Sequence, residues 1–152
     1  EGQIVACAGG AFSTTQMGEI TRETLKKALK TMVGTLKLPV PAYSAVKRDG
    51  QRLYAKARKG QEFTVPTREM VVHHAELIDV KEVLLWNEEG SECWRGYEVR
   101  VIFDVASGVY IRSLAEELGG RLGHPATTAA LRRLTVGEYS IKDAQKLSEL
   151  VV

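Results

Sequence analysis

The sequence predicts an α+β protein in which a mainly antiparallel, mixed sheet carries a few packed helices. Its strand-like segments follow one another in hairpin-like runs, as at 75–86 and 97–105, whereas segments with the apolar spacing of a helix are few. The chain has 152 residues, of which 44% are hydrophobic and 26% are charged, as in an ordinary globular protein. No repeat, linker or low-complexity segment interrupts it. We therefore expect residues 1–152 to form one domain without an internal boundary.

The first helix is predicted to begin after Thr21, which can cap it. Ile20 and Leu25 suit a hydrophobic staple around this cap, and Gly34 is placed to end the helix. The stripe expected to be buried consists of Leu25, Ala28, Leu29 and Met32. The sequence therefore predicts a helix whose role is packing.

A basic segment follows two prolines that forbid helix. Pro39 and Pro41 impose an extended approach, Asp49-Gly50 is a turn signal, and residues 53–59 suit a short helix ended by Gly60. The cations of this segment are Lys47, Arg48, Arg52, Lys56, Arg58 and Lys59. Together with Tyr43 and Tyr54 they suit RNA, because tyrosine stacks on bases and cations bind phosphates. The alternative is that the tyrosines are core residues and the cations a solvated face.

Residues 62–72 are expected to begin extended. The central strands are expected at 75–86 and 97–105, with a polar hairpin loop at 87–92. The last strand alternates most clearly, with Tyr97, Val99, Val101, Phe103 and Val105 on one face. Ser107-Gly108 breaks it. Helical spacing then appears in Ile111, Leu114, Ala115 and Leu118, and either Gly119-Gly120 or Gly123 can close this helix.

Tyr110 and Arg112 therefore lie at a junction between a strand and a helix. The first-turn amides of a helix point outward and favour a polar or anionic partner, so a ligand site is one interpretation. The other is that Tyr110 is a half-buried core aromatic and Arg112 a surface charge. Sequence periodicity alone does not decide between them.

The C-terminal part is less clear. Residues 128–139 are ambiguous between helix and strand, although Gly137 favours a strand-like end. A final helix is expected over 143–150, with Asp143 as its cap.

Several classes of function are not indicated. Cys7 and Cys93 have neither the spacing of a metal site nor that of a disulfide framework. His73 and His74 are neighbours in a strand and point to opposite faces, and His124 stands alone. The net charge of +2 does not require a nucleic-acid partner, and no apolar run or signal peptide indicates a membrane. We expect a cytoplasmic protein with no metal, no cofactor and no membrane partner.

Three segments nevertheless carry a family resemblance. Pro41 to Gly60 resembles the proline-tyrosine-serine-alanine-hydrophobic-lysine motif of the TruB family of tRNA pseudouridine synthases. Gly108 to Leu114 is similar to its glycine-threonine-tyrosine-isoleucine-arginine motif, and Leu131 to Arg133 with Gly137 is similar to its third motif. The three occur in the family's order over nearly the whole chain, which makes chance similarity an unlikely explanation.

The resemblance implies an isomerase that flips a T-arm uridine out of tRNA and converts it to pseudouridine without a cofactor. Tyr110 matches the tyrosine that lies against the flipped base and moves a proton, and Arg112 matches the arginine that pairs with the catalytic aspartate. Leu131 matches an apolar residue that packs on the base. The Tyr43 motif is given no catalytic step. The candidate substrate-binding residues are Leu131, Tyr43, Lys47 and Arg132.

The sequence also departs from the family pattern. Val109 and Ala42 replace the usual motif residues, which are tolerable changes. More seriously, the nucleophilic aspartate belongs to a glycine-threonine-leucine-aspartate-proline-leucine motif that this sequence lacks. The four aspartates present, none in such a motif, are Asp49, Asp79, Asp104 and Asp143.

The resemblance thus implies the later, C-terminal half of a catalytic domain, with an incomplete pseudouridine synthase-like fold and no PUA-type domain. Glu1 to Val5 reads like part of a hairpin, which also suggests a start within a longer domain. One hypothesis is a synthase piece, inactive alone, whose partners are the T arm of tRNA and either the missing N-terminal half or a second copy. The alternative is a non-catalytic RNA-binding module of the same fold.

Overall fold

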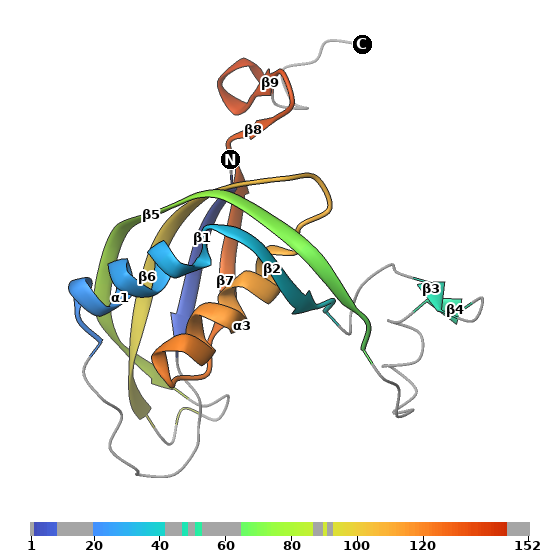
Figure 1. The fold of residues 1–152 in the computed structure, drawn as a ribbon. Helices are drawn as coiled ribbons and strands as arrows, with labels where there is room; N and C mark the ends of the chain where they lie inside the picture. The colour runs from blue at the N-terminus through green and yellow to red at the C-terminus, as the bar shows by residue number, and fades with distance from the viewer. Residues whose placement is uncertain are drawn as a thin grey trace.

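The computed structural model describes a five-stranded sheet with two helices on one side (Figure 1). The described residues are 2–8, 20–41, 47–48, 51–52, 65–86, 90 and 93–145. The strand order is β2-β5-β6-β1-β7, and every neighbouring pair is antiparallel. The strands are β1 (Gly2–Ala8), β2 (Gly34–Pro39), β5 (Thr67–Trp86), β6 (Cys93–Val105) and β7 (Thr127–Arg133). The predicted α+β class is confirmed.

The core lies between the sheet and the helices α1 (Arg22–Met32) and α3 (Ile111–Leu122). Alternate residues of β6 point into it, since Val99, Val101 and Phe103 are buried. In Figure 1 both helices lie within the curve of the sheet, with α1 against β5 and α3 against β7 and β1. Neither helix is long and apolar enough to cross a membrane, a statement that covers the described residues alone.

The predicted start of α1 is confirmed in detail. Thr21 is the N-cap, and its side chain accepts a hydrogen bond from the Thr24 amide at 3.2 Å, while the Thr24 hydroxyl accepts one from the Thr21 amide at 3.1 Å. The staple residues Ile20 and Leu25 are both buried. The helix ends at Met32, and Gly34, with φ of 118°, begins β2.

The end of α3 is set by Gly123, the second of the two predicted alternatives. Gly123 is left-handed, with φ of 74°, and its amide donates to the carbonyls of Gly119 and Gly120. The amide of His124 donates to the Gly119 carbonyl at 2.9 Å. Gly119 and Gly120 therefore lie inside the helix.

The ambiguous segment 128–139 is strand. It comprises most of β7 and a small hairpin of β8 (Thr135–Val136) and β9 (Tyr139–Ser140), with Gly137 at φ of 58° in its turn. The expected cap at Asp143 is wrong. Asp143 ends a short 3-10 helix, Ile141–Asp143, capped by Ser140, and Ala144 is extended. Residues 146–150 lie outside the described part of the chain.

The basic segment is described only in part. β3 (Lys47–Arg48) and β4 (Gln51–Arg52) pair antiparallel, which agrees with the turn predicted between them. Asp49, Gly50, Tyr43, Tyr54 and the expected helix over 53–59 lie outside the described residues.

Candidate functional site

The candidate site begins where β6 gives way to α3. The strand ends at Val105, and Gly108, with φ of 85°, turns the chain. Tyr110 is the N-cap residue of α3, with extended backbone (φ −95°, ψ 108°) and no capping hydrogen bond from its side chain. The strand-to-helix junction predicted for Tyr110 and Arg112 is therefore present.

The junction faces an extension of the neighbouring strands. Val72 of β5 pairs with Val105, the last residue of β6, so residues 67–71 of β5 continue past the end of β6 and pair with β2. The Ala106 amide donates to the Val71 carbonyl at 3.0 Å, which holds the start of the connection against β5. The C-terminal end of β2 thus lies at the end of the sheet where α3 begins.

Ser113 joins these two parts directly. Its side chain is 2% exposed, and its hydroxyl donates a 2.7 Å hydrogen bond to the carbonyl of Pro39, the last residue of β2. Next to it, Val40 is buried and its amide donates to the Pro66 carbonyl at 2.9 Å. The first turn of α3 is thereby fixed to Pro39 at the end of β2, 74 residues away in the sequence.

Sequence reasoning missed Ser113. A serine flanking a buried helical stripe has the same appearance as an ordinary surface serine, because its partner is a backbone carbonyl that no sequence pattern identifies. The available signal was its place within the Gly108 to Leu114 motif, directly after Arg112.

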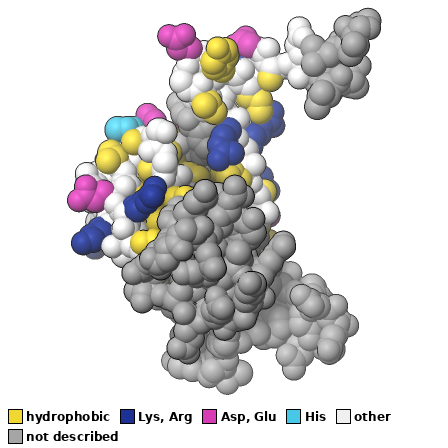
Figure 2. All heavy atoms as spheres, turned by 90° about the vertical axis from the view of Figure 1, so that its right-hand side faces the viewer, with side chains coloured by type: hydrophobic (Ala, Val, Ile, Leu, Met, Phe, Trp, Pro, Cys, Tyr) yellow, Lys and Arg dark blue, Asp and Glu magenta, His cyan; other side chains and the backbone are white. Residues whose placement is uncertain are grey.

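The two junction residues differ in their surroundings. Tyr110 is half-buried and packs against the hydrophobic core, whereas Arg112 is exposed on the first turn of α3. Core packing therefore accounts for part of the Tyr110 ring and leaves part of it accessible. Figure 2 shows hydrophobic and Lys or Arg side chains as neighbours on the described part of the face that it presents.

Leu131 lies in β7, a strand that packs against α3. Ile4 of β1 pairs with both Val101 and Leu131, so Leu131 shares the sheet face of buried Val101, the face covered by α3. β7 and β6 are both antiparallel to β1 and so run in the same direction, which brings their C-terminal ends to one end of the sheet. Leu131 is 41% exposed, more than a core residue requires.

The structure does not place the other substrate-binding candidates beside the junction. Arg132 follows Leu131 in the strand and lies on the opposite face of the sheet. Lys47 is in β3, where only the backbone is described, and Tyr43 lies outside the described residues.

The described aspartates lie in β5, β6 and the 3-10 helix. Asp79 forms ion pairs with Arg22 at 3.8 Å and with Lys81 at 3.5 Å. Asp104 is exposed on the sheet face opposite α3, since its neighbour Phe103 points into the core. Asp143 lies in the 3-10 helix, and Asp49 is outside the described residues.

Comparison with known proteins gives a consistent picture. The profile described as "TruB family pseudouridylate synthase (N terminal domain)" matches residues 6–111, a range that includes Tyr110 and ends just before Arg112. A protein named tRNA pseudouridine synthase B from Fusobacterium nucleatum is 37% identical over 124 residues, 82% of this chain and 38% of that protein. The protein of that name from Bordetella parapertussis is 35% identical over 149 residues, 98% of this chain and 53% of its own length. The chain thus spans about half or less of these relatives.

A solved structure shares the fold. The crystal structure of a Cbf5-Nop10-Gar1 complex contains a chain that superimposes with a TM-score of 0.54 at 20% sequence identity. The match covers 92% of this chain and 31% of that one. At this level of identity the likeness concerns the fold alone.

Proposed function

Because the chain belongs to the TruB family of pseudouridylate synthases, we propose that it forms the later part of a catalytic domain that isomerises a T-arm uridine of tRNA to pseudouridine. The observation that carries the proposal is the junction. Tyr110 and Arg112 lie at the start of α3, and Ser113 fixes that turn to Pro39. Leu131 lies on the face of the sheet that α3 covers.

In the proposed reaction the glycosidic carbon of the ribose moves from N1 to C5 of uracil, C5 loses its proton, and N1 gains one. The uridine must first leave the RNA stack so that these atoms can be reached. Tyr110 lies against the flipped base and moves a proton, for which its partly accessible ring is suited. Leu131 supplies an apolar contact to the base from β7.

Arg112 has an electrostatic role in this proposal. An arginine next to a carboxylate lowers the pKa of that carboxylate and so keeps it ionised as a nucleophile. None of the aspartates in these 152 residues belongs to the family's aspartate motif. We therefore propose that the nucleophilic aspartate comes from another segment or chain, and that this polypeptide alone has no synthase activity.

Release of tritium from tRNA labelled at uracil C5 tests this directly. The isolated chain should give no release above background, with the synthase of Fusobacterium nucleatum as the positive control. Adding a polypeptide that carries the aspartate motif of such a relative should restore release if the two associate. Release by the chain alone would contradict the proposed origin of the nucleophile.

A non-catalytic RNA-binding module is the second candidate, and the lack of an aspartate motif favours it. T-arm hairpins with the target uridine or with cytidine in its place distinguish the two. A synthase piece should prefer uridine, whereas a module that only binds RNA should bind both equally and should not support tritium release with any added segment.

The open sheet edges suggest how a second polypeptide would attach. Among the described strands, β2 and β7 form the edges, and an unpaired edge is a template for another strand. We propose that β7 pairs with the missing part of the domain or with a second copy. Light scattering should show a dimer if a second copy binds, and a monomer that becomes a heterodimer if a separate segment does.

A further inference from the structure

The helix α1 carries more positive charge than the whole chain. Its residues Arg22–Met32 include four cations and one carboxylate, Glu23, a net charge of +3, whereas the chain of 152 residues has a formal net charge of +2. The cations are Arg22, Lys26, Lys27 and Lys30. This concentration makes α1 a candidate surface for an anionic partner.

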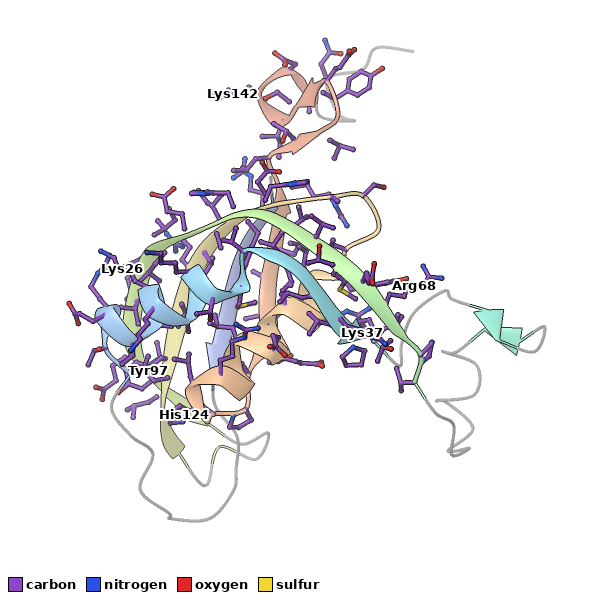
Figure 3. The ribbon with its side chains drawn as sticks, in the orientation of Figure 1. Lys26, Lys37, Arg68, Tyr97, His124 and Lys142 are labelled. Carbon is purple, nitrogen blue, oxygen red and sulfur yellow. The ribbon has the colours of Figure 1, made fainter. Side chains whose placement is uncertain are left out.

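Most of this charge is not neutralised. Lys26, Lys27 and Lys30 are exposed, and no carboxylate of the described residues lies within ion-pair distance of them. Arg22 differs, because it lies 3.8 Å from Asp79 and donates to the Ile78 carbonyl at 3.3 Å. In Figure 3, Lys26 extends from α1 beside β5, where it lines the groove between the two.

Two grooves flank α1, and cations line both. The groove toward α3 has a volume of about 510 Å³, and its polar lining residues are Thr24, Lys27, Thr31, Arg121 and His124. The groove toward β5 has a volume of about 390 Å³, and its charged or titratable lining residues are Arg22, Lys26, Lys30, His74 and Glu76. Glu76 is thus the one carboxylate in the described lining of either groove.

Hydrogen bonds of Arg121 connect the two helices that line the first groove. Arg121 bridges the two helices, with its guanidinium donating to the Thr31 carbonyl at 2.8 Å, to the Thr31 hydroxyl at 2.6 Å and to Glu117 at 2.7 Å. Because Glu117 pairs with Arg121, the charge available to a ligand in this groove comes mainly from Lys27.

The arrangement fits an extended polyanion. Arg22, Lys26 and Lys30 are four residues apart, so they repeat about every 6 Å along one side of the helix. A basic amphipathic helix can also bind anionic lipid through its apolar face. Here that face is already occupied, because Leu25, Leu29 and Met32 are at most 1% exposed in the core. Phosphates of an RNA backbone need only the cations.

We propose that the outer face of α1 and its two grooves form a phosphate-binding surface for RNA, separate from the uridine site. Arg121 and His124 lie at the C-terminal end of α3, whereas Tyr110 is at its start, and twelve helical residues span about 18 Å. The surface would therefore contact RNA remote from the target uridine. This inference rests on the proposed function only in taking RNA as the partner.

The test compares two double variants that each remove two positive charges. K26Q/K30Q alters the surface, and K81Q/K142Q alters exposed lysines elsewhere on the chain. Binding of an unmodified tRNA is measured against salt concentration, with circular dichroism to confirm folding. Each lost phosphate contact reduces the salt slope by about 1. We expect a reduction of about 2 for K26Q/K30Q and none for K81Q/K142Q.

Hairpins with uridine or cytidine at the target position separate this inference from the proposed function. K26Q/K30Q should weaken binding of both equally, because phosphate contacts carry no base information. If the unaltered chain does not prefer uridine, the proposed function fails while the salt-slope result stands. Equal slopes for the two double variants, or no tRNA binding at any salt, would overturn the inference. The inference would also be overturned if K26Q/K30Q weakened the binding of polyglutamate and left tRNA binding unchanged. That result would assign the surface to an acidic protein.

Discussion

Two adjacent glycines in α3 should respond in opposite ways to the same substitution. Gly119 and Gly120 both lie inside the helix, where alanine is intrinsically preferred. A Cβ added at Gly120 would meet no atom within 4 Å. One added at Gly119 would lie 2.5 Å from the His124 carbonyl oxygen and 2.6 Å and 2.9 Å from the Cβ and amide nitrogen of Ala126.

The magnitudes follow from these distances. Gly120→Ala gains the helix preference without a steric cost, so it should raise the free energy of unfolding by about 0.5–1 kcal/mol. Gly119→Ala gains the same preference but forces the backbone at His124 and Ala126 away from the helix. Overpacking of this kind costs about 1–3 kcal/mol. The net effect should be a loss of up to about 2.5 kcal/mol.

Urea unfolding followed by circular dichroism measures both variants against the unaltered chain. The midpoints should move in opposite directions at similar m-values, since the fold and the buried surface are retained. Equal stabilisation by the two substitutions would show that α3 and the start of β7 do not pack as closely as described, and would refute the reasoning.

Two further substitutions test contacts around the site. Ser113→Ala removes the hydroxyl that donates to the Pro39 carbonyl and should lower the free energy of unfolding by about 0.5–1.5 kcal/mol, measured in the same way; no loss would mean that water replaces the hydroxyl. Leu131→Ala should cost under about 1 kcal/mol because the side chain is 41% exposed, whereas Leu114→Ala, at 0% exposed, should cost about 2–5 kcal/mol. Similar losses at the two leucines would make Leu131 a core residue instead of a candidate for base contact.

Local sequence patterns predicted the elements that depend on neighbouring residues, such as an alternating strand and a capped helix. The alternation from Tyr97 to Val105 is a strand, and Thr21 caps α1. The same patterns did not separate helix from strand at 128–139, because Ala130 and Leu131 suit both and pairing with β1 decides. Asp143 has the residue type of a cap, but Ser140 already caps the turn that ends there.

The order of the strands and the contact that fixes the start of α3 depend on residues far apart in the sequence. The first strand, β1, lies between β6 and β7, about 90 and 120 residues later in the chain, and no local pattern encodes that order. The family resemblance predicts that Tyr110, Arg112 and Leu131 belong to one site, through their matched motifs. The resemblance did not reveal the contact that holds the first turn of α3, since the hydrogen bond from Ser113 to Pro39 spans 74 residues and ends on a backbone carbonyl.

The packing at Gly119 bears on the site as well as on stability. β7 follows α3 through Gly123 and Ala126, so the close approach at Gly119 sets where β7 lies against the helix that begins at Tyr110. Moving that contact shifts Leu131 relative to Tyr110 without touching either residue. In an assembly that releases tritium, Gly119→Ala should therefore lower kcat more than Gly120→Ala does. Equal kcat values for two variants of opposite stability would mean that the spacing of Tyr110 and Leu131 does not limit the reaction.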